Sequence, residues 1–357
     1  MPATRMTAPL RISYVIDPRF PGGTSSAVAA ELRVVAGFGS VSVHAIESRM
    51  FHGQGIAPQL QSAFDELGLV PVWNAPVISG DIVILHNPAF LKFQPSLPAR
   101  IICRHLVVVT HENFVRPGGA EGFDVARCLG QIDRATLALE KTLAPISAHN
   151  RATVEGWSKG RTGSAKWSLL DEDWFNICAF DLRPPTAAPQ DRRGRHSRPG
   201  FEKFPETSAL DLCFPAHAVA NTILGADSLV AEGILRPHWR LHPFLGLDLG
   251  RYFEMVDFMV YFTAPTWRES FGRVLAEGLA AGKVVISDRD TASTFGRGVI
   301  GATPAEADSI IARHLDRPDL YRRQVAAGQE VLARFSETRF AAMFGAFAAR
   351  AQAKAAA

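Results

Sequence analysis

Short apolar segments alternate with helix-like segments along most of this chain, and this alternation limits the folds that it can adopt. Apolar runs rich in β-branched residues occupy positions 10–16, 41–46, 81–86 and 106–111, and turns or helix-like stretches separate them. Strands that alternate with helices typically form a parallel, doubly wound sheet. The sequence therefore predicts an α/β fold, in which ligands bind beyond the carboxyl ends of the strands.

A helix is expected directly after the first strand. Residues 24–37, TSSAVAAELRVVAG, offer Thr24 or Ser25 as the N-cap and Gly37 as the C-cap. Residues 127–144, RCLGQIDRATLALEKTLA, also have helical spacing, so we expect a second helix there.

An irregular segment separates this half of the chain from a second alternating half. Residues 180–200, FDLRPPTAAPQDRRGRHSRPG, are rich in proline and arginine and are typical of a connection between domains. The segments that follow include a helix between Gly272 and Gly282 and a helical stretch from about Pro304. The strand candidates beyond the connection are residues 210–216, 239–244, 257–264 and 283–288.

Two domains fit the length of the chain. At about 100–200 residues per domain, 357 residues favour two domains. We expect an N-terminal Rossmann-like domain at residues 1–165 and a linker at 166–190. We expect a C-terminal Rossmann-like domain at 191–335, and a helix at 336–357 that packs back on the N-terminal domain.

Composition argues against several classes of protein. Lys and Arg total 38 and Asp and Glu total 35, and the resulting +3 is too small to indicate a nucleic-acid partner. None of the four cysteines forms a Cys-x-x-Cys pair, which argues against a zinc or redox motif. Neither His-Glu-x-x-His nor a suitable Asp-x-Asp motif is present, so no metal site is expected.

The apolar segments are too short for a membrane protein. The first 20 residues lack the apolar core of a signal peptide. No stretch approaches the roughly 20 apolar residues that cross a bilayer. We expect a cytoplasmic protein, and contact with the inner face of the membrane remains open.

Two glutamates surround a Ser-Phe-Gly turn in the second half. Glu269 is followed directly by Ser270, Phe271 and Gly272, and Glu277 lies inside the helix that starts after the glycine. Free N–H groups at such a helix start suit a phosphate, and the carboxylate of Glu277 can accept two hydrogen bonds from a ribose diol. Glu269 can face another hydroxyl-rich group. The alternative is an amphipathic helix with ordinary surface glutamates.

The segment ESFGRVLAEGLAAGKVVI, residues 269–286, resembles the signature of retaining glycosyltransferases of the GT-B fold, especially glycosyltransferase family 4. The resemblance implies two Rossmann-like domains that face a cleft, with the acceptor on the side of the domain at 1–165 and the nucleotide sugar bound by the domain at 191–335. It implies that Glu277 holds the ribose of a nucleotide sugar and that Glu269 contacts the transferred sugar. Backbone amides of the turn formed by Ser270, Phe271 and Gly272 would assist.

Two further features lie at strand ends in the first half. Gly22 and Gly23 stand between a strand and a helix, where they form either a simple turn or a phosphate cradle. Family members have a similar glycine-rich loop, so the resemblance favours substrate binding. His111 ends another apolar strand, and the resemblance implies that it approaches hydroxyls of the donor sugar. His86, at a neighbouring strand end, is the rival candidate.

Basic residues near position 200 are candidates for binding a diphosphate. Arg195 can bind a diphosphate with two parallel hydrogen bonds, and Lys203 can bind it as a point charge. The alternative is that this segment is a solvated basic linker. The family shows Gly-Arg and then Lys-Gly, and Gly194-Arg195 fits this pattern. Lys203 is instead followed by Phe204, so Arg198 could share its task.

The sequence thus predicts a retaining, metal-independent glycosyltransferase. Its donor would be a nucleotide-diphospho sugar, with no further cofactor, and its acceptor a hydroxyl of a glycan, glycolipid or small molecule. Synthesis of bacterial surface polysaccharide is a setting that the family analogy offers. The alternatives are a catalytically silent GT-B subunit that binds glycan or a partner, and a GT-B-fold nucleotide-sugar epimerase. The nucleotide, the sugar, the acceptor and the oligomeric state remain open.

Overall fold

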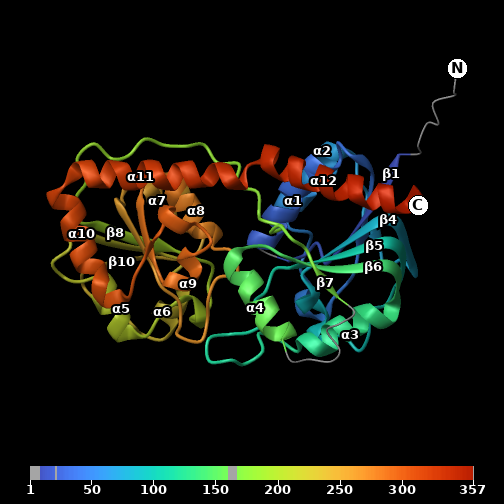
Figure 1. Ribbon diagram of the computed structural model, residues 1–357. Coiled ribbons are helices and arrows are strands. Elements are labelled where there is room, and N and C mark those ends of the chain that lie inside the picture. The colour runs from blue at the N-terminus through green and yellow to red at the C-terminus, as the bar shows by residue number, and fades with distance from the viewer. Residues whose placement is uncertain (1–8, 21, 160–166, 357) are drawn as a thin grey trace, which may run out of the picture. The chain divides into compact units, whose positions relative to one another are not determined.

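The computed structural model describes residues 9–20, 22–159 and 167–356 and contains two parallel β-sheets with helices around them (Figure 1). The first sheet has seven strands in the order β3-β2-β1-β4-β5-β6-β7, and the second has six in the order β10-β9-β8-β11-β12-β13. All strand pairs within these sheets are parallel. The predicted α/β class with doubly wound sheets is confirmed.

The chain forms two compact units, each built around one sheet. The first unit comprises Met1–Val115, Glu121–Ile177 and Glu337–Ala357, and the second comprises Arg116–Ala120 and Cys178–Ser336. The C-terminal helix α12 (Glu337–Ala356) therefore belongs to the first unit. There Phe344 packs edge-on against Phe38, with ring centroids 5.2 Å apart.

The elements of the first unit follow the order strand, helix, strand over much of its length. Its strands are β1 (Leu10–Ile16), β2 (Gly39–Ala45), β3 (Val72–Trp73), β4 (Val77–His86), β5 (Arg100–Thr110), β6 (Thr136–Pro145) and β7 (Ser168–Leu169). Its helices besides α12 are α1 (Gly23–Val35), α2 (Pro58–Leu67), α3 (Val125–Ala135) and α4 (Ala148–Ser158).

The second unit repeats this organisation with shorter strands. Its strands are β8 (Arg192–His196), β9 (Ala220–Leu224), β10 (Trp239–His242), β11 (Phe258–Tyr261), β12 (Val284–Ser287) and β13 (Ile300–Gly301). A 3₁₀ turn, η4 (Phe201–Lys203), follows β8. The helices are α5 (Thr207–Cys213), α6 (Asp227–Ala231), α7 (Leu249–Glu254), α8 (Arg273–Ala280), α9 (Arg289–Ala292), α10 (Ala307–Asp316) and α11 (Pro318–Leu332).

Strand order reverses once in each sheet, and the candidate ligand sites lie at these two points. In the first sheet the chain builds β1, β2 and β3 to one side and then returns to place β4 beside β1. In the second sheet it builds β8, β9 and β10 and then returns to place β11 beside β8. Neighbouring strands at such a switch point send their following loops in opposite directions, which opens a crevice for a ligand.

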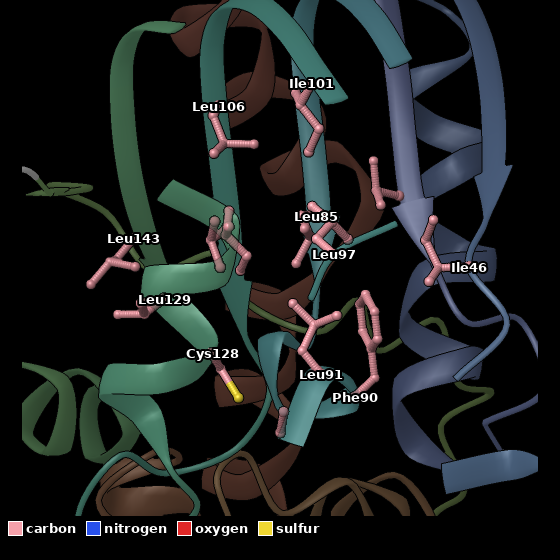
Figure 2. Packing of buried hydrophobic residues seen from close by; sticks show 14 of the residues in the cluster. Ile46, Leu85, Phe90, Leu91, Leu97, Ile101, Leu106, Cys128, Leu129 and Leu143 are labelled. Carbon is pink, nitrogen blue, oxygen red and sulfur yellow. The ribbon is translucent and has the colours of Figure 1, made fainter. Parts of the chain in front are cut away.

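The apolar runs that predicted strands supply the cores of the units. In the first unit, Leu85 of β4 and Leu106 of β5 are fully buried, and Leu129 of α3 covers the same face of the sheet (Figure 2). Burial of each such side chain contributes about 1.5–3 kcal/mol. The sheet is thereby a rigid base for the residues at its strand ends.

The helix predicted at 127–144 ends earlier than expected. Only α3 (Val125–Ala135) is helical, and the TLALEKTLAP that follows is strand β6. Leu, Ala, Glu and Lys favour helix on their own, but β6 pairs with β5 along nine residue pairs. Tertiary pairing outweighs a propensity of a few tenths of a kcal/mol per residue.

The N-cap of helix α1 lies two or three residues before the predicted Thr24 or Ser25. Gly22 is its N-cap, with φ +107°, and no side chain caps the helix. Ser25 is not a cap, because its hydroxyl donates to the carbonyl of Phe20. The C-cap is Ala36 rather than Gly37.

The expected connection at 180–200 contains a central strand, and the strand expected at 210–216 is not formed. RRGRH is β8, and Leu210–Cys213 is the end of helix α5. A run of arginines rarely indicates a buried strand. Here the charge of Arg193 is neutralised by Asp191, at 2.7 Å, and by Asp308, at 2.6 Å, so the segment can be buried. Gly194 is required here, because a Cβ atom would lie 2.5 Å from Val256 Cγ2.

Candidate active site

The switch point of the second sheet gathers several of the predicted residues. β8 and β11 are neighbours, with Met259 opposite Gly194. Arg195 lies near the end of β8, Lys203 follows in η4, and Glu269 lies in the loop between β11 and α8. Segments that are far apart in sequence thus meet at one edge of the sheet.

Glu269 is the centre of a hydrogen-bonded cluster. Its Oε1 atom lies 2.6 Å from Lys203 Nζ and accepts a hydrogen bond of 2.6 Å from the Tyr261 hydroxyl. Burial raises the pKa of Glu269, but the charge and hydrogen bonds of Lys203 and Tyr261 outweigh burial and hold the pKa below its ordinary value. Oε2 has no hydrogen-bond partner among the described residues. Glu269 is therefore an ionised carboxylate with one oxygen available to a ligand.

Arg195 lies within the protein beside this cluster. Its side chain is 1% exposed, and its guanidinium donates to the carbonyl oxygens of Phe262, at 2.9 Å, and Lys203. The rings of Phe204 and Tyr261 lie 4.1 and 4.9 Å from its central carbon. The resemblance implies a direct grip on the diphosphate, whereas this geometry ties the guanidinium to the two segments that carry Lys203 and Glu269.

Arg198 is a cation near this cluster that is accessible to solvent. Its side chain is 48% exposed and forms an ion pair of 2.9 Å with Glu202. The charge of Arg198 also helps to lower the pKa of Glu269. Arg198 can therefore turn toward an anionic ligand while Arg195 cannot.

Gly272 and the start of α8 form the second part of the site. Gly272 is the N-cap, with φ +86°, and no side chain caps the helix. A Cβ atom at this position would lie 3.2 Å from Thr291 Cγ2, so both the backbone angle and the space favour glycine. The uncapped N–H groups of the first turn suit an anion such as a phosphate.

The buried side chain of Phe271 anchors the Ser-Phe-Gly turn. Its ring is 3% exposed and packs edge-on against Phe295 and Phe335, at centroid distances of 5.5 and 5.2 Å. Phe271 can therefore offer a ligand its backbone, while its side chain anchors the turn. Ser270, beside it, is half-buried.

Glu277 lies one helical turn deeper, in α8. Its Oε1 atom accepts a hydrogen bond of 3.1 Å from Arg273 Nε, and its Oε2 atom lies 3.6 Å from His196 Nε2. Burial raises the pKa of Glu277 despite the nearby Arg273. Burial lowers the pKa of His196 to about 3, so this imidazole is neutral and leaves Oε2 without a cationic partner.

The remaining predicted residues belong to the first unit. Gly22 and Gly23 are exposed at the start of α1, and Pro21 lies outside the described residues. His86 ends β4 and His111 follows β5. These two alternative candidates are in contact, because His86 Nδ1 lies 2.9 Å from His111 Nε2. Both belong to one hydrogen-bonded pair.

Sequence reasoning missed three partners of these groups. The sequence indicates Tyr261 only as part of a strand, and no motif marks Tyr14 and Glu31, which lie beside His86. The signal for Glu31 was a charged residue between Ala30 and Leu32 on a helix of small and apolar side chains. A carboxylate in that setting is either exposed or bound to buried donors.

No helix in the described residues 9–20, 22–159 and 167–356 combines the length and the apolarity that are needed to cross a membrane. Within the same residues, no group of three or more His, Cys, Asp and Glu side chains is placed to hold a metal ion.

Comparison with known proteins finds similar structures, although no family model matches the chain and no curated protein does. Alr3699/HepE of Anabaena, solved with UDP and glucose, has a TM-score of 0.67 and 15% identity over 96% of this chain and 100% of that one. The pneumococcal O-GlcNAc transferase GtfA, solved with UDP and GlcNAc, has a TM-score of 0.63 and 10% identity over 96% and 99%. An α-glucosyltransferase, solved with UDP-glucose and DNA containing an abasic site, has a TM-score of 0.55 and 11% identity over 94% and 98%.

These similarities extend over both units of the chain. At such low identity they establish the fold and leave the activity to be argued from the residues. The expected GT-B fold class, with two Rossmann-like units, is confirmed.

Proposed function

We propose that this protein is a retaining glycosyltransferase that moves a sugar from a nucleotide-diphospho sugar to a hydroxyl acceptor without a metal ion. The observation that carries the proposal is the Glu269, Lys203 and Tyr261 cluster at a strand-order switch point, next to the uncapped start of α8. A fixed carboxylate suits sugar hydroxyls, and a free helix N-terminus suits a phosphate.

The diphosphate would be held by groups that neutralise charge. The N–H groups after Gly272, the exposed Arg198 and the ammonium of Lys203 are the available donors. Negative charge develops on the diphosphate as the glycosidic bond breaks, so these groups stabilise the transition state more than the ground state. Arg195 would act as a positioning residue, because it fastens the segments that carry Lys203 and Glu269.

The two glutamates would hold different parts of the donor. Glu277 would accept hydrogen bonds from the ribose, and the neutral His196 next to it leaves Oε2 free for this role. Glu269 would accept a hydrogen bond from the transferred sugar through Oε2. His111 would contact a sugar hydroxyl, and Gly22 and Gly23 would approach the ligand with their backbone.

Retention implies attack on the face of the sugar that the diphosphate leaves. In the proposed step the bond between the anomeric carbon and the phosphate oxygen breaks, and the acceptor oxygen forms the new bond on the same face. The acceptor proton passes to the departing phosphate oxygen. The products are the glycoside and the nucleoside diphosphate, so atoms and charges balance.

UDP-sugars are the first donors to test, because the similar structures named above were solved with UDP or UDP-glucose. Affinity for UDP, UDP-glucose and UDP-GlcNAc is measured by calorimetry, and UDP release is then followed with candidate hydroxyl acceptors. Product NMR should show the anomeric configuration of the donor. An inverted product would refute retention. Interconversion of the nucleotide sugar without an acceptor would indicate an epimerase, and binding without any turnover would indicate a silent subunit.

A further inference from the structure

A buried chain of polar side chains leads to His111 through the first unit. It begins at Glu31 of α1, which is 4% exposed. Oε1 of Glu31 accepts a hydrogen bond of 2.8 Å from the Tyr14 hydroxyl, and Oε2 accepts one of 2.8 Å from Trp174 Nε1. An indole N–H can only donate, and burial and the adjacent Glu31 raise the pKa of Tyr14, which keeps its hydroxyl protonated. Both oxygens thus act as acceptors, the pattern of an ionised carboxylate.

His86 connects this carboxylate to His111. Its Nε2 atom lies 3.3 Å from Glu31 Oε1, a charge contact whose geometry falls outside that of a hydrogen bond. Its ring stacks on that of Tyr14, with centroids 5.6 Å apart and planes 6° from parallel, which fixes the ring orientation. When the ring of His86 carries a single proton, a lone pair on Nε2 would face the negative carboxylate in a buried place, so that proton belongs on Nε2.

The tautomer of His86 decides that of His111. His86 Nδ1 then carries a lone pair, and it lies 2.9 Å from His111 Nε2, so His111 Nε2–H must donate. Burial and the adjacent His86 lower the pKa of His111 well below its ordinary value, which keeps this imidazole neutral. The proton on Nε2 leaves Nδ1 with a lone pair, and Nδ1 has no hydrogen-bond partner among the described residues.

We propose that Glu31 and His86 are positioning residues that hold His111 in its Nε2–H tautomer, so that Nδ1 accepts a hydrogen bond from a substrate hydroxyl. The identification of that hydroxyl as part of a sugar substrate rests on the proposed function. The tautomer itself follows from the three side chains alone. His111 in this form selects a hydroxyl and disfavours a group that offers only an acceptor, such as a fluorine or a carbonyl.

The first test reads the tautomer directly. The full chain is labelled with ¹⁵N at histidine and studied without nucleotide by long-range ¹H–¹⁵N NMR at about pH 7.5, well above the lowered pKa of His111. His111→Gln identifies the His111 signals by their loss. We expect a bare Nδ1 and a protonated Nε2. A proton on Nδ1 would overturn the proposal.

Glu31→Gln tests the cause of this tautomer. The amide N–H₂ of Gln can donate to His86 Nε2, which would move the proton of His86 to Nδ1. His86 would then donate to His111 Nε2, and the proton of His111 would move to Nδ1. We expect a rise in the Nδ1–H form of His111, and an unchanged tautomer would refute a positioning role for Glu31.

Glu140→Gln is the matched control. Glu140 Oε2 lies 3.2 Å from His105 Nδ1 in the same unit, so this change also neutralises a carboxylate that pairs with a histidine. The control should leave the His111 tautomer and turnover unchanged. Thermal melting of both variants reports whether the fold is retained.

Turnover completes the test. A substrate hydroxyl that meets Nδ1–H instead of a lone pair loses one hydrogen bond, so Glu31→Gln should reduce kcat/KM about tenfold. A tautomer switch with unchanged kcat/KM would overturn the role of Nδ1 while the proposed function stands. If the wild-type protein transferred no sugar, the proposed function would be overturned. The NMR result would still decide whether Glu31 and His86 fix the tautomer of His111.

Discussion

Lys203 Nζ lies 2.6 Å from Glu269 Oε1, and this ion pair joins the turn after β8 to the loop after β11. Both side chains are largely buried, at 9% and 16% exposure. Tyr261 donates to the same oxygen, so Glu269 can reach a ligand only through Oε2. The pair therefore fixes the direction in which Glu269 points and keeps a positive charge next to the proposed sugar site.

The two glutamates should respond differently to neutralisation. Glu277→Gln removes the proposed ribose contact, which free nucleoside diphosphate shares with the intact donor. A lost hydrogen bond to a charged group is worth about 1.5–3 kcal/mol, so both ligands should bind roughly 10- to 150-fold more weakly. Glu269→Gln should leave affinity for nucleoside diphosphate nearly unchanged and reduce turnover sharply. Calorimetry with UDP and initial-rate assays measure the two effects.

The reverse pattern would exchange the roles of these residues. If Glu269→Gln lost nucleotide affinity and Glu277→Gln did not, Glu269 would be the ribose ligand. If neither variant changed affinity or rate, residues 269–286 would form only a helix with ordinary surface charges. Thermal melting must accompany Glu269→Gln, because this change leaves the buried Lys203 without its counter-charge.

Arg195→Ala should lower stability as well as turnover. The substitution leaves the buried carbonyl oxygens of Phe262 and Lys203 without their donor. An unsatisfied buried polar group costs about 1–3 kcal/mol, so the urea midpoint should fall measurably. Turnover should fall through the displaced Lys203 and Glu269. Reduced UDP affinity at an unchanged urea midpoint would instead indicate that Arg195 contacts the diphosphate directly.

Arg195→Lys is the companion variant. It retains a positive charge but has only one nitrogen and cannot reach two carbonyl groups with the fork of a guanidinium. We expect it to be destabilised like Arg195→Ala. Wild-type stability in this variant would show that charge alone is sufficient at this position.

Stability should fall in mild acid because of His196. Burial lowers its pKa to about 3 in the folded state, against about 6.5 in an unfolded chain. Between these values the unfolded state binds the extra proton, so the contribution of His196 is complete above pH 6.5 and declines as the pH falls toward 3. At about 1.4 kcal/mol per pH unit, lowering the pH from about 7 to about 5 should cost roughly 2 kcal/mol.

Urea unfolding of His196→Gln at both pH values checks this contribution. The loss of stability between about pH 7 and pH 5 should be smaller in this variant than in the wild type by roughly 2 kcal/mol. His52→Gln removes an exposed imidazole and should behave as the wild type. Equal losses in His196→Gln and the wild type would show that His196 is not the group that takes up the proton.

Turnover should persist when metal ions are removed. The proposed charge neutralisation comes from Lys203, Arg198 and the N–H groups at the start of α8. Excess EDTA should therefore leave the rate of UDP release unchanged. An EDTA-inhibited rate that Mn²⁺ or Mg²⁺ restores would replace this mechanism with a metal-assisted one.

Local sequence patterns predicted those elements whose structure depends on their own residues. The apolar run at Leu10–Ile16 forms β1 with the predicted bounds, and Gly272 begins α8 as its N-cap. A strand that is buried on both faces is usually rich in apolar residues, and a positive φ at a helix start favours glycine. The segment that contains both glutamates could be recognised because its strand, turn and helix lie within one short stretch.

Other elements depended on residues far away in the chain. Residues 136–145 have helical propensity but form β6, because β5 offers backbone partners along nine residue pairs. The basic RRGRH forms a central strand because Asp191 and Asp308 neutralise Arg193 there. Neither partner strand nor counter-charge can be read from the segment itself.

The sequence by itself determined the α/β class, the turn around Gly272 and the residue types available for binding a nucleotide sugar, since these follow from periodicity and local backbone geometry. Only the tertiary structure decided what each polar side chain does. It tied Arg195 to two carbonyl oxygens, paired Lys203 with Glu269, and joined Glu31 and His86 to His111. The physical reason is that a buried charge is stable only with a counter-charge or hydrogen-bond partner, and in the folded chain that partner can come from a residue far away in sequence.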